Sequence, residues 1–174
     1  RVFLEDPAYE LDLFEQTGVI RWVTDMAKIP QEHGVKNVYG ELGTTFATSA
    51  VSNPRFAAAV VGALVNGLGA DHVVWGTDSV WYGSPQWQIE AMRRLEIPAD
   101  MMKKQGWKTA LGGDDSKVKR MIFGENSARL YGVRPRADYE QLDNDKLAQM
   151  KQEYQREGIE RNNRFYGYIG KRTA

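Results

Sequence analysis

The chain has 174 residues, with 23 Lys or Arg and 23 Asp or Glu, so its formal net charge is zero. A neutral chain gives no electrostatic reason to expect nucleic acid or an anionic membrane as a partner, and no apolar run approaches the roughly 20 residues that span a bilayer. Cysteine is absent, which excludes disulfides, thiolate nucleophiles and thiolate metal sites. Any metal ion must therefore be held by His, Asp or Glu.

The first residues, RVFLEDPAYE, lack an initiator Met and are typical of the interior of a protein. We expect either a processed chain or a piece of a longer protein, and a cytoplasmic location. Residues 1–17 have no regular hydrophobic period and are predicted to form a loop.

Helical and strand patterns alternate after this loop. Helices are predicted at residues 18–33, 53–69, 84–98, 99–109 and 114–131, and strands at residues 35–42 and 71–77. Residues 43–52, rich in Thr, Ser and Ala, are predicted to be a loop. The helix boundaries are marked by Asn53-Pro54, Ser84-Pro85, Asp115-Ser116, Gly34 and Gly132.

This alternation indicates a parallel α/β fold. Two parallel strands are too few for a stable sheet domain, so the chain is expected to be the end of a larger α/β protein. From residue 134 onward the sequence becomes strongly charged, and Leu147, Met150 and Tyr154 form an apolar stripe that predicts a helix over residues 144–157. We therefore predict two parts, residues 1–133 and a charged helical tail at residues 134–174.

Two carboxylates lie at the carboxyl ends of the predicted strands, Glu41 at the end of the first and Asp78 directly after the second. Functional groups of parallel α/β folds lie at the carboxyl ends of the strands, so this pair is a candidate for sharing a metal ion or for dividing acid and base roles. Two plainer interpretations remain open. An Asp after a strand is often a turn residue or helix N-cap that binds backbone amides, and Asp78 fits this description. A Glu at a strand end often pairs with a basic neighbour, which is the plainer interpretation of Glu41.

Other residues near these strand ends complete the candidate site. The residues predicted to line its mouth and to contact a small-molecule substrate are Glu41, Thr44, Ser79, Trp81 and Tyr82, although Trp81 and Tyr82 are more often packing residues. His33 lies at a helix end, where an imidazole favours the helix dipole. His72 precedes its strand, at the end opposite the candidate site, and is not expected to bind a metal ion.

Two motifs, HVVWGTDSVW and MIFGENSARLYGV, resemble the carboxyl-terminal part of the amidohydrolase-related family, which includes proteins similar to aminocarboxymuconate-semialdehyde decarboxylase. The family's eighth barrel strand ends in a Gly-[Ser/Thr]-Asp turn, which residues 76–78 match, and its closing helix is matched by residues 122–132. VKNVYGELG resembles the seventh strand. The resemblance implies the carboxyl-terminal part of a TIM-like (β/α)8 barrel, about strands 7 and 8 with flanking helices, in residues 1–133.

The same resemblance implies a divalent metal, commonly zinc, with Asp78 as a metal ligand or as the base toward a metal-bound water. That water would hydrolyse a C–N, ester or lactone bond, whereas related members decarboxylate their substrate. The chain departs from the family pattern because it has no His-x-His, and His33 and His72 match neither ligand position. We expect the remaining ligands to lie upstream, and the chain to be inactive and without tight metal binding on its own.

The expected partners are the amino-terminal part of the barrel, a small-molecule substrate and further copies of the chain in a homo-oligomer.

Two other hypotheses about the function of the chain stay open. In the first, the chain is a non-catalytic association module, a relic half-barrel whose strand edges and charged tail bind a partner. Alternatively, it belongs to a different α/β enzyme whose Gly-Thr-Asp-Ser turn only coincides with that of the family.

Overall fold

A computed structural model describes residues 7–134 and 146–157 of the chain. The chain divides into two compact units, residues 1–133 and 134–174, which are described separately. The described part of the second unit is helix α11 (Lys146–Arg156), close to the helix predicted at residues 144–157. Its Met150 and Tyr154 side chains are exposed to solvent.

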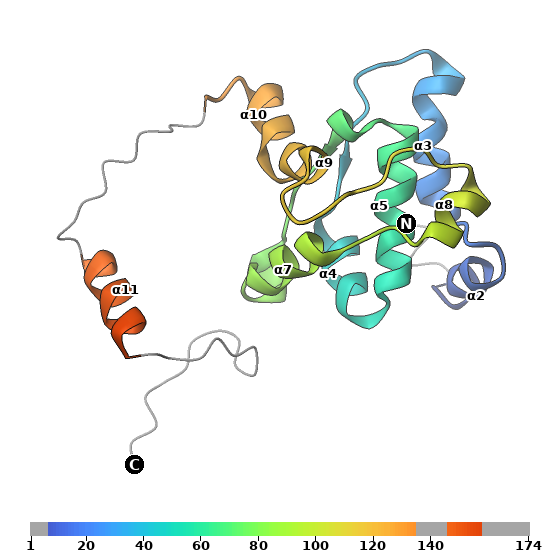
Figure 1. The fold of residues 1–174 in the computed structure, drawn as a ribbon. Helices are drawn as coiled ribbons and strands as arrows, with labels where there is room; N and C mark the ends of the chain where they lie inside the picture. The colour runs from blue at the N-terminus through green and yellow to red at the C-terminus, as the bar shows by residue number, and fades with distance from the viewer. Residues whose placement is uncertain (1–6, 135–145, 158–174) are drawn as a thin grey trace. The chain divides into compact units, whose positions relative to one another are not determined.

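The first unit is mainly helical, with a small sheet at its centre (Figure 1). Its elements in chain order are α2 (Pro7–Thr17), α3 (Arg21–His33), β1 (Gly40–Glu41), α4 (Gly43–Ser52), α5 (Pro54–Gly67), η1 (Ala70–His72), β2 (Val73–Val74), α6 (Ser79–Tyr82), α7 (Gln86–Arg94), α8 (Ala99–Gln105), α9 (Lys117–Arg120), the π-helical turn η2 (Met121–Glu125) and α10 (Asn126–Tyr131).

The two strands run parallel, with Gly40 opposite Val73 and Glu41 opposite Val74. The amide of Leu42 extends the pairing by donating to the carbonyl of Val74 at 3.3 Å. Both strands lie inside the ranges predicted from the sequence, and their parallel direction agrees with the predicted α/β class, but each is much shorter than predicted. Among the described residues no third strand pairs with this sheet. The apolar residues on either side of β1 and β2 therefore have no further strand to form backbone hydrogen bonds with.

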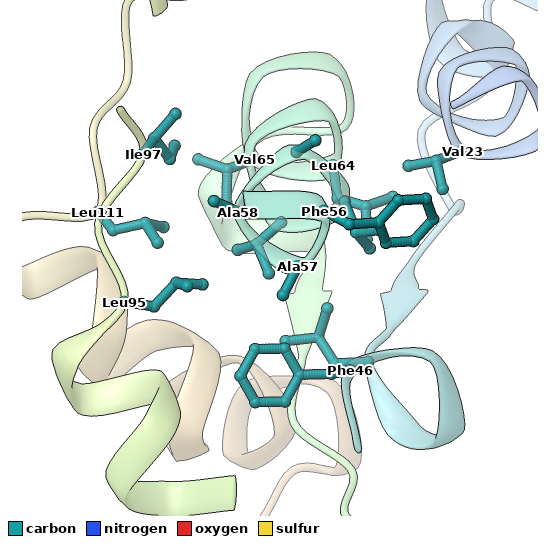
Figure 2. Close-up of a cluster of buried hydrophobic side chains, with 14 of the residues drawn as sticks. Val23, Phe46, Phe56, Ala57, Ala58, Leu64, Val65, Leu95, Ile97 and Leu111 are labelled. Atoms are coloured by element: carbon teal, nitrogen blue, oxygen red, sulfur yellow. The ribbon is translucent and has the colours of Figure 1, made fainter. Parts of the chain in front are cut away.

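Helix α5 is the centre of the hydrophobic core. Its sequence, PRFAAAVVGALVNG, is apolar nearly all round, and its side chains pack on several sides at once. Figure 2 shows Val23 of α3 on one side of α5, and Leu95, Ile97 and Leu111 on the other. A helix buried in this way holds the two strands and the helices that follow them in one compact unit.

Two segments predicted as loops are helices. Residues 7–17 form α2. The buried face of this helix combines the apolar Phe14 with the charged Glu10, whose carboxylate pairs with Arg21 at 2.5 Å. A search for apolar periodicity misses such a face. Residues 43–52 form α4. Its hydroxyl side chains donate to backbone carbonyls one turn earlier in the helix, as Ser49 does to Thr45 at 2.6 Å. They therefore do not draw the backbone into the turn conformations that Ser and Thr often favour.

Several predicted helix boundaries are confirmed. The side chains of Asn53 and Ser116 cap α5 and α9 by accepting backbone amides, and Gly34 and Gly132 end α3 and α10 in the left-handed conformation. Gly18 also has a positive φ and ends α2, so α3 begins at Arg21 and not at residue 18.

Three other helix predictions need correction. Helix α7 begins at Gln86 and has Pro85 at its cap position, where Ser84 was expected. Gly106 is left-handed and ends α8, which was predicted to continue to residue 109. The helix predicted over residues 114–131 begins at Lys117 and contains the π-helical turn η2.

Candidate active site at the ends of the two strands

The carboxylates of Glu41 and Asp78 meet at the carboxyl ends of the two strands. Glu41 is the last residue of β1, and Asp78 lies in the turn that follows β2. A Cβ atom on Gly43 would lie 2.7 Å from Oε2 of Glu41 and 2.8 Å from Oδ2 of Asp78, so both groups border the same small space. The parallel pairing of the strands therefore brings the two predicted carboxylates together.

Glu41 binds backbone and not a basic side chain. Its Oε1 accepts the amide of Gly43 at 3.1 Å, and no ion pair joins it to Lys, Arg or His among the described residues. Loss of hydration raises the pKa of the Glu41 carboxyl, and the negative charge of Asp78 raises it further, although the Gly43 amide acts in the opposite direction. Glu41 is therefore better able to hold a proton than an ordinary glutamate.

Asp78 has an unusual backbone conformation. With φ 46° and ψ 35° it is the single non-glycine residue with positive φ among the described residues, a conformation that Asp tolerates better than most side chains. Its Oδ2 accepts the hydroxyl of Thr44 at 2.7 Å. The side chain makes no capping hydrogen bond to α6, so the turn-cap interpretation is not what the structure shows.

The backbone around Asp78 is fixed at several points. Its carbonyl accepts the amides of Trp81 at 2.9 Å and Tyr82 at 3.2 Å, while the amide of Ser79 donates to the hydroxyl of Thr77 at 3.3 Å. Gln88 of α7 donates its side-chain amide to the carbonyl of Thr77 at 2.8 Å and is fully buried. The sequence analysis missed Gln88, although it lies one turn before the buried Met92 and therefore on the core face of α7.

The other predicted contact residues divide into two groups. Thr44 binds Asp78 directly, and Ser79, which is partly buried, begins α6 beside it. Trp81 is 80% exposed and Tyr82 is partly buried, and no hydrogen bond or ring contact joins either side chain to Glu41 or Asp78 in the part of the chain that the structure describes. Their role in binding a substrate stays a prediction.

The described residues do not make a complete metal site. No group of three or more His, Asp or Glu side chains in residues 7–134 and 146–157 is arranged to hold a metal ion. His72 lies before β2, where its Nε2 is 3.1 Å from the carbonyl of Lys36 and its Nδ1 is 3.1 Å from Asp71, and His33 ends α3. Zinc in proteins takes three or four ligands from side chains, so the pair of carboxylates is too small a donor set.

Comparison with protein families identifies a matching family. The sequence profile of the family described as Amidohydrolase matches residues 25–133, a range that contains both strands, Glu41 and Asp78. The chain belongs to the amidohydrolase family. The family resemblance read from the two motifs is therefore confirmed, and it assigns this chain a general amidohydrolase-type function.

Two properties of the amidohydrolase superfamily bear on the fold and the site. Its domain implies a TIM-like barrel, and the described residues are mainly helical, with a partial α/β fold of two parallel strands. Its members typically use divalent metals.

No curated protein and no solved structure matches this amidohydrolase chain significantly. In the described residues, every helix is too short or too polar to cross a membrane.

Proposed function

We propose that this amidohydrolase chain contributes strands 7 and 8 of a TIM-like barrel to an enzyme that hydrolyses an amide, ester or lactone bond. The observation that supports the proposal is the convergence of Glu41 and Asp78 at the carboxyl ends of adjacent parallel strands, where barrel enzymes place their catalytic groups. Residues at this end of a barrel serve chemistry, whereas those at the opposite end serve stability.

The two carboxylates suit different steps of hydrolysis. Asp78 accepts the proton of a water molecule as the water oxygen bonds to the substrate carbonyl carbon. Glu41, whose pKa is raised by lost hydration and by Asp78, protonates the leaving nitrogen or oxygen as its bond to that carbon breaks. The Thr44 hydroxyl orients Asp78 by donating to Oδ2, and Ser79, Trp81 and Tyr82 contact the substrate.

The proposed enzyme depends on a divalent metal, with zinc as the first candidate and Asp78 as one ligand. Because the described residues offer only a pair of carboxylates, the remaining ligands must come from polypeptide beyond them, in the amino-terminal part of the barrel. Calorimetric titration of the 174-residue chain with Zn²⁺ should detect no stoichiometric site of submicromolar affinity. Such a site would contradict the assignment of an incomplete ligand set.

Activity assays test the proposed roles. The protein that carries this sequence is offered small amides, esters and lactones, and the Asp78→Asn and Glu41→Gln variants are compared with Asp115→Asn. Asp115 is an exposed carboxylate that pairs with Arg120, and its replacement should leave the turnover unchanged. Loss of one general acid or base lowers kcat by about a hundredfold or more, and wild-type turnover by Asp78→Asn would contradict the proposal.

The product identifies the reaction class. Release of CO2 from a carboxylated substrate, with dependence on Asp78, would replace hydrolysis by decarboxylation, the alternative within the same superfamily. Stable association with a partner and no turnover of any compound, even with metal supplied, would favour a non-catalytic association module.

A further inference from the structure

Gln88 connects the core of the first unit to the turn that carries Asp78. It lies in α7, which packs against α4, and its Nε2 donates to the carbonyl of Thr77 at 2.8 Å. That carbonyl belongs to the peptide group that joins Thr77 to Asp78. A buried side chain on a packed helix therefore holds one end of the residue that has the left-handed conformation.

The cost of placing Gln88 there is visible in the structure. The side chain is completely buried, yet its Oε1 has no hydrogen-bond partner among the described residues. An unpaired buried carbonyl oxygen is unfavourable, and an apolar residue of the same length would avoid that cost. Packing alone does not explain why a glutamine occupies this position.

Asp78 itself needs support of this kind. The left-handed region is unfavourable for a residue other than glycine, and such a conformation persists only where its surroundings fix it. The carbonyl of Asp78 is held by the amides of Trp81 and Tyr82, and its side chain by Thr44. Gln88 fixes the preceding peptide plane, which sets the direction in which the Asp78 side chain leaves the backbone.

We infer that Gln88 is a positioning residue, whose buried amide fixes the Thr77–Asp78 peptide and thereby holds the Asp78 carboxylate beside Glu41 and Thr44. The geometric part of this inference stands on the contacts alone. Its consequence for catalysis rests on the proposed function, in which Asp78 handles a proton.

The chain offers a matched control. Gln105, at the end of α8, donates its Nε2 to the carbonyls of Thr17 at 3.4 Å and Gly18 at 3.2 Å, which are remote from the carboxylate pair in sequence and belong to the end of α2. Gln88→Met and Gln105→Met each replace an amide by an apolar chain of similar length. The first removes the donor to one backbone carbonyl, and the second removes the donor to two.

Nuclear magnetic resonance on the full chain tests the positioning role. In Gln88→Met the backbone chemical shifts of Asp78 should move away from left-handed values. The amides of Trp81 and Tyr82 should exchange with solvent about tenfold faster, the equivalent of one lost hydrogen bond. Gln105→Met should leave both readouts as in the wild type. A folded Gln88→Met variant with wild-type shifts and exchange at these residues would overturn the inference.

A second variant and a kinetic readout complete the test. Gln88→Leu, which also lacks the donor, replaces Gln88→Met if the latter does not fold. In the enzyme, either variant should lower kcat by about tenfold to a hundredfold with little change in KM, because misplacement of a catalytic group by about 1 Å has that effect. Altered Asp78 shifts with unchanged kcat would uphold the positioning role and contradict the proposed function of Asp78 instead.

Discussion

Gly76 leaves the space that the Glu41 carboxylate occupies. A Cβ atom at position 76 would overlap Oε1 of Glu41 and lie 2.6 Å from its Cδ. The first residue of the Gly-Thr-Asp turn therefore has a steric role toward the neighbouring strand. The turn positions Asp78 and also permits the second carboxylate to lie beside it.

Replacement of Gly76 by Ala should displace the Glu41 carboxylate from its place beside Asp78. The atoms that the added methyl group meets are the far end of a flexible, exposed Glu41 side chain, which can move aside, so the free energy of unfolding should change by less than about 1 kcal/mol. Loss of the carboxylate from the site should instead lower kcat in the proposed reaction by about tenfold or more. Gly124→Ala is the matched control, because a Cβ there meets no atom within 4 Å, and equal kcat in the two variants would contradict the steric role of Gly76.

Thr44→Val should remove the hydrogen bond to Oδ2 of Asp78 while keeping the shape of the side chain. Because Thr44 is exposed, the expected change in the free energy of unfolding is below about 1 kcal/mol, but kcat in the proposed reaction should fall by roughly tenfold. Thr44→Ser retains the hydroxyl and should restore most of the activity. Thr48→Val, which removes a hydroxyl bonded to the carbonyl of Thr44, serves as control, and an equal loss in it would argue against a specific role of Thr44.

The sequence predicted which segments carry the candidate site better than it predicted the segments between them. The parallel pairing, the caps at Asn53 and Ser116 and the glycine stops at Gly34 and Gly132 follow from local stereochemistry, which short motifs report well. Helix α2 was missed because the buried Glu10, which pairs with the half-exposed Arg21, occupies a position on its core face where an apolar residue would be expected. The strands were predicted too long because ladder length depends on the neighbouring strands available, which no local pattern reveals.

Within the site, the approach of Glu41 and Asp78 was predictable because both lie at the carboxyl ends of parallel strands. The left-handed backbone of Asp78 and the space left by Gly76 were not, since both depend on atoms that come together only in the folded chain. Gln88 was missed because a buried glutamine has no motif of its own. The signal available in the sequence was its position one turn before Met92, which places a polar residue on the core face of a predicted helix.

Asn126 in the MIFGENSARLYGV motif should be important for stability. Its fully buried amide donates to the carbonyls of Ala70 at 2.8 Å and Val73 at 2.7 Å, so it ties the start of β2 to α10. Asn126→Ala leaves two carbonyls without this donor and should lower the free energy of unfolding by about 2–4 kcal/mol. Thermal or urea unfolding measures the loss. Ser127→Ala, at the next position of the same helix, should change stability by less than about 0.5 kcal/mol, and a similar loss there would contradict the assignment.

Lys119 gives the stability of the first unit a pH dependence whose sign is fixed by burial. Its side chain is 1% exposed, and its Nζ donates to the carbonyl of Arg93 at 2.6 Å, near the end of α7. Loss of hydration lowers the pKa of the Lys119 ammonium below its ordinary value of 10.5, although Asp114 and Glu96 act in the opposite direction. The protonated form is therefore less favourable in the native state than in the unfolded chain.

The sign of the effect follows from counting protons. At low pH both states of the protein are protonated at Lys119, and the full penalty of burying the charge is present. As the pH rises above the lowered native pKa, the native state releases its proton first, while the unfolded chain holds its proton up to about 10.5. The unfolded state then binds more protons, so stability increases with pH in this window.

We expect the free energy of unfolding of the wild type, relative to Lys119→Met, to rise as the pH is increased toward 10.5 and to level off above it. Taking the difference between the two proteins cancels the other groups that titrate in this range. The exposed Lys117→Met variant corrects for the change in net charge. A difference that falls with pH would mean that the Arg93 carbonyl and the nearby carboxylates stabilise the ammonium more than burial disfavours it.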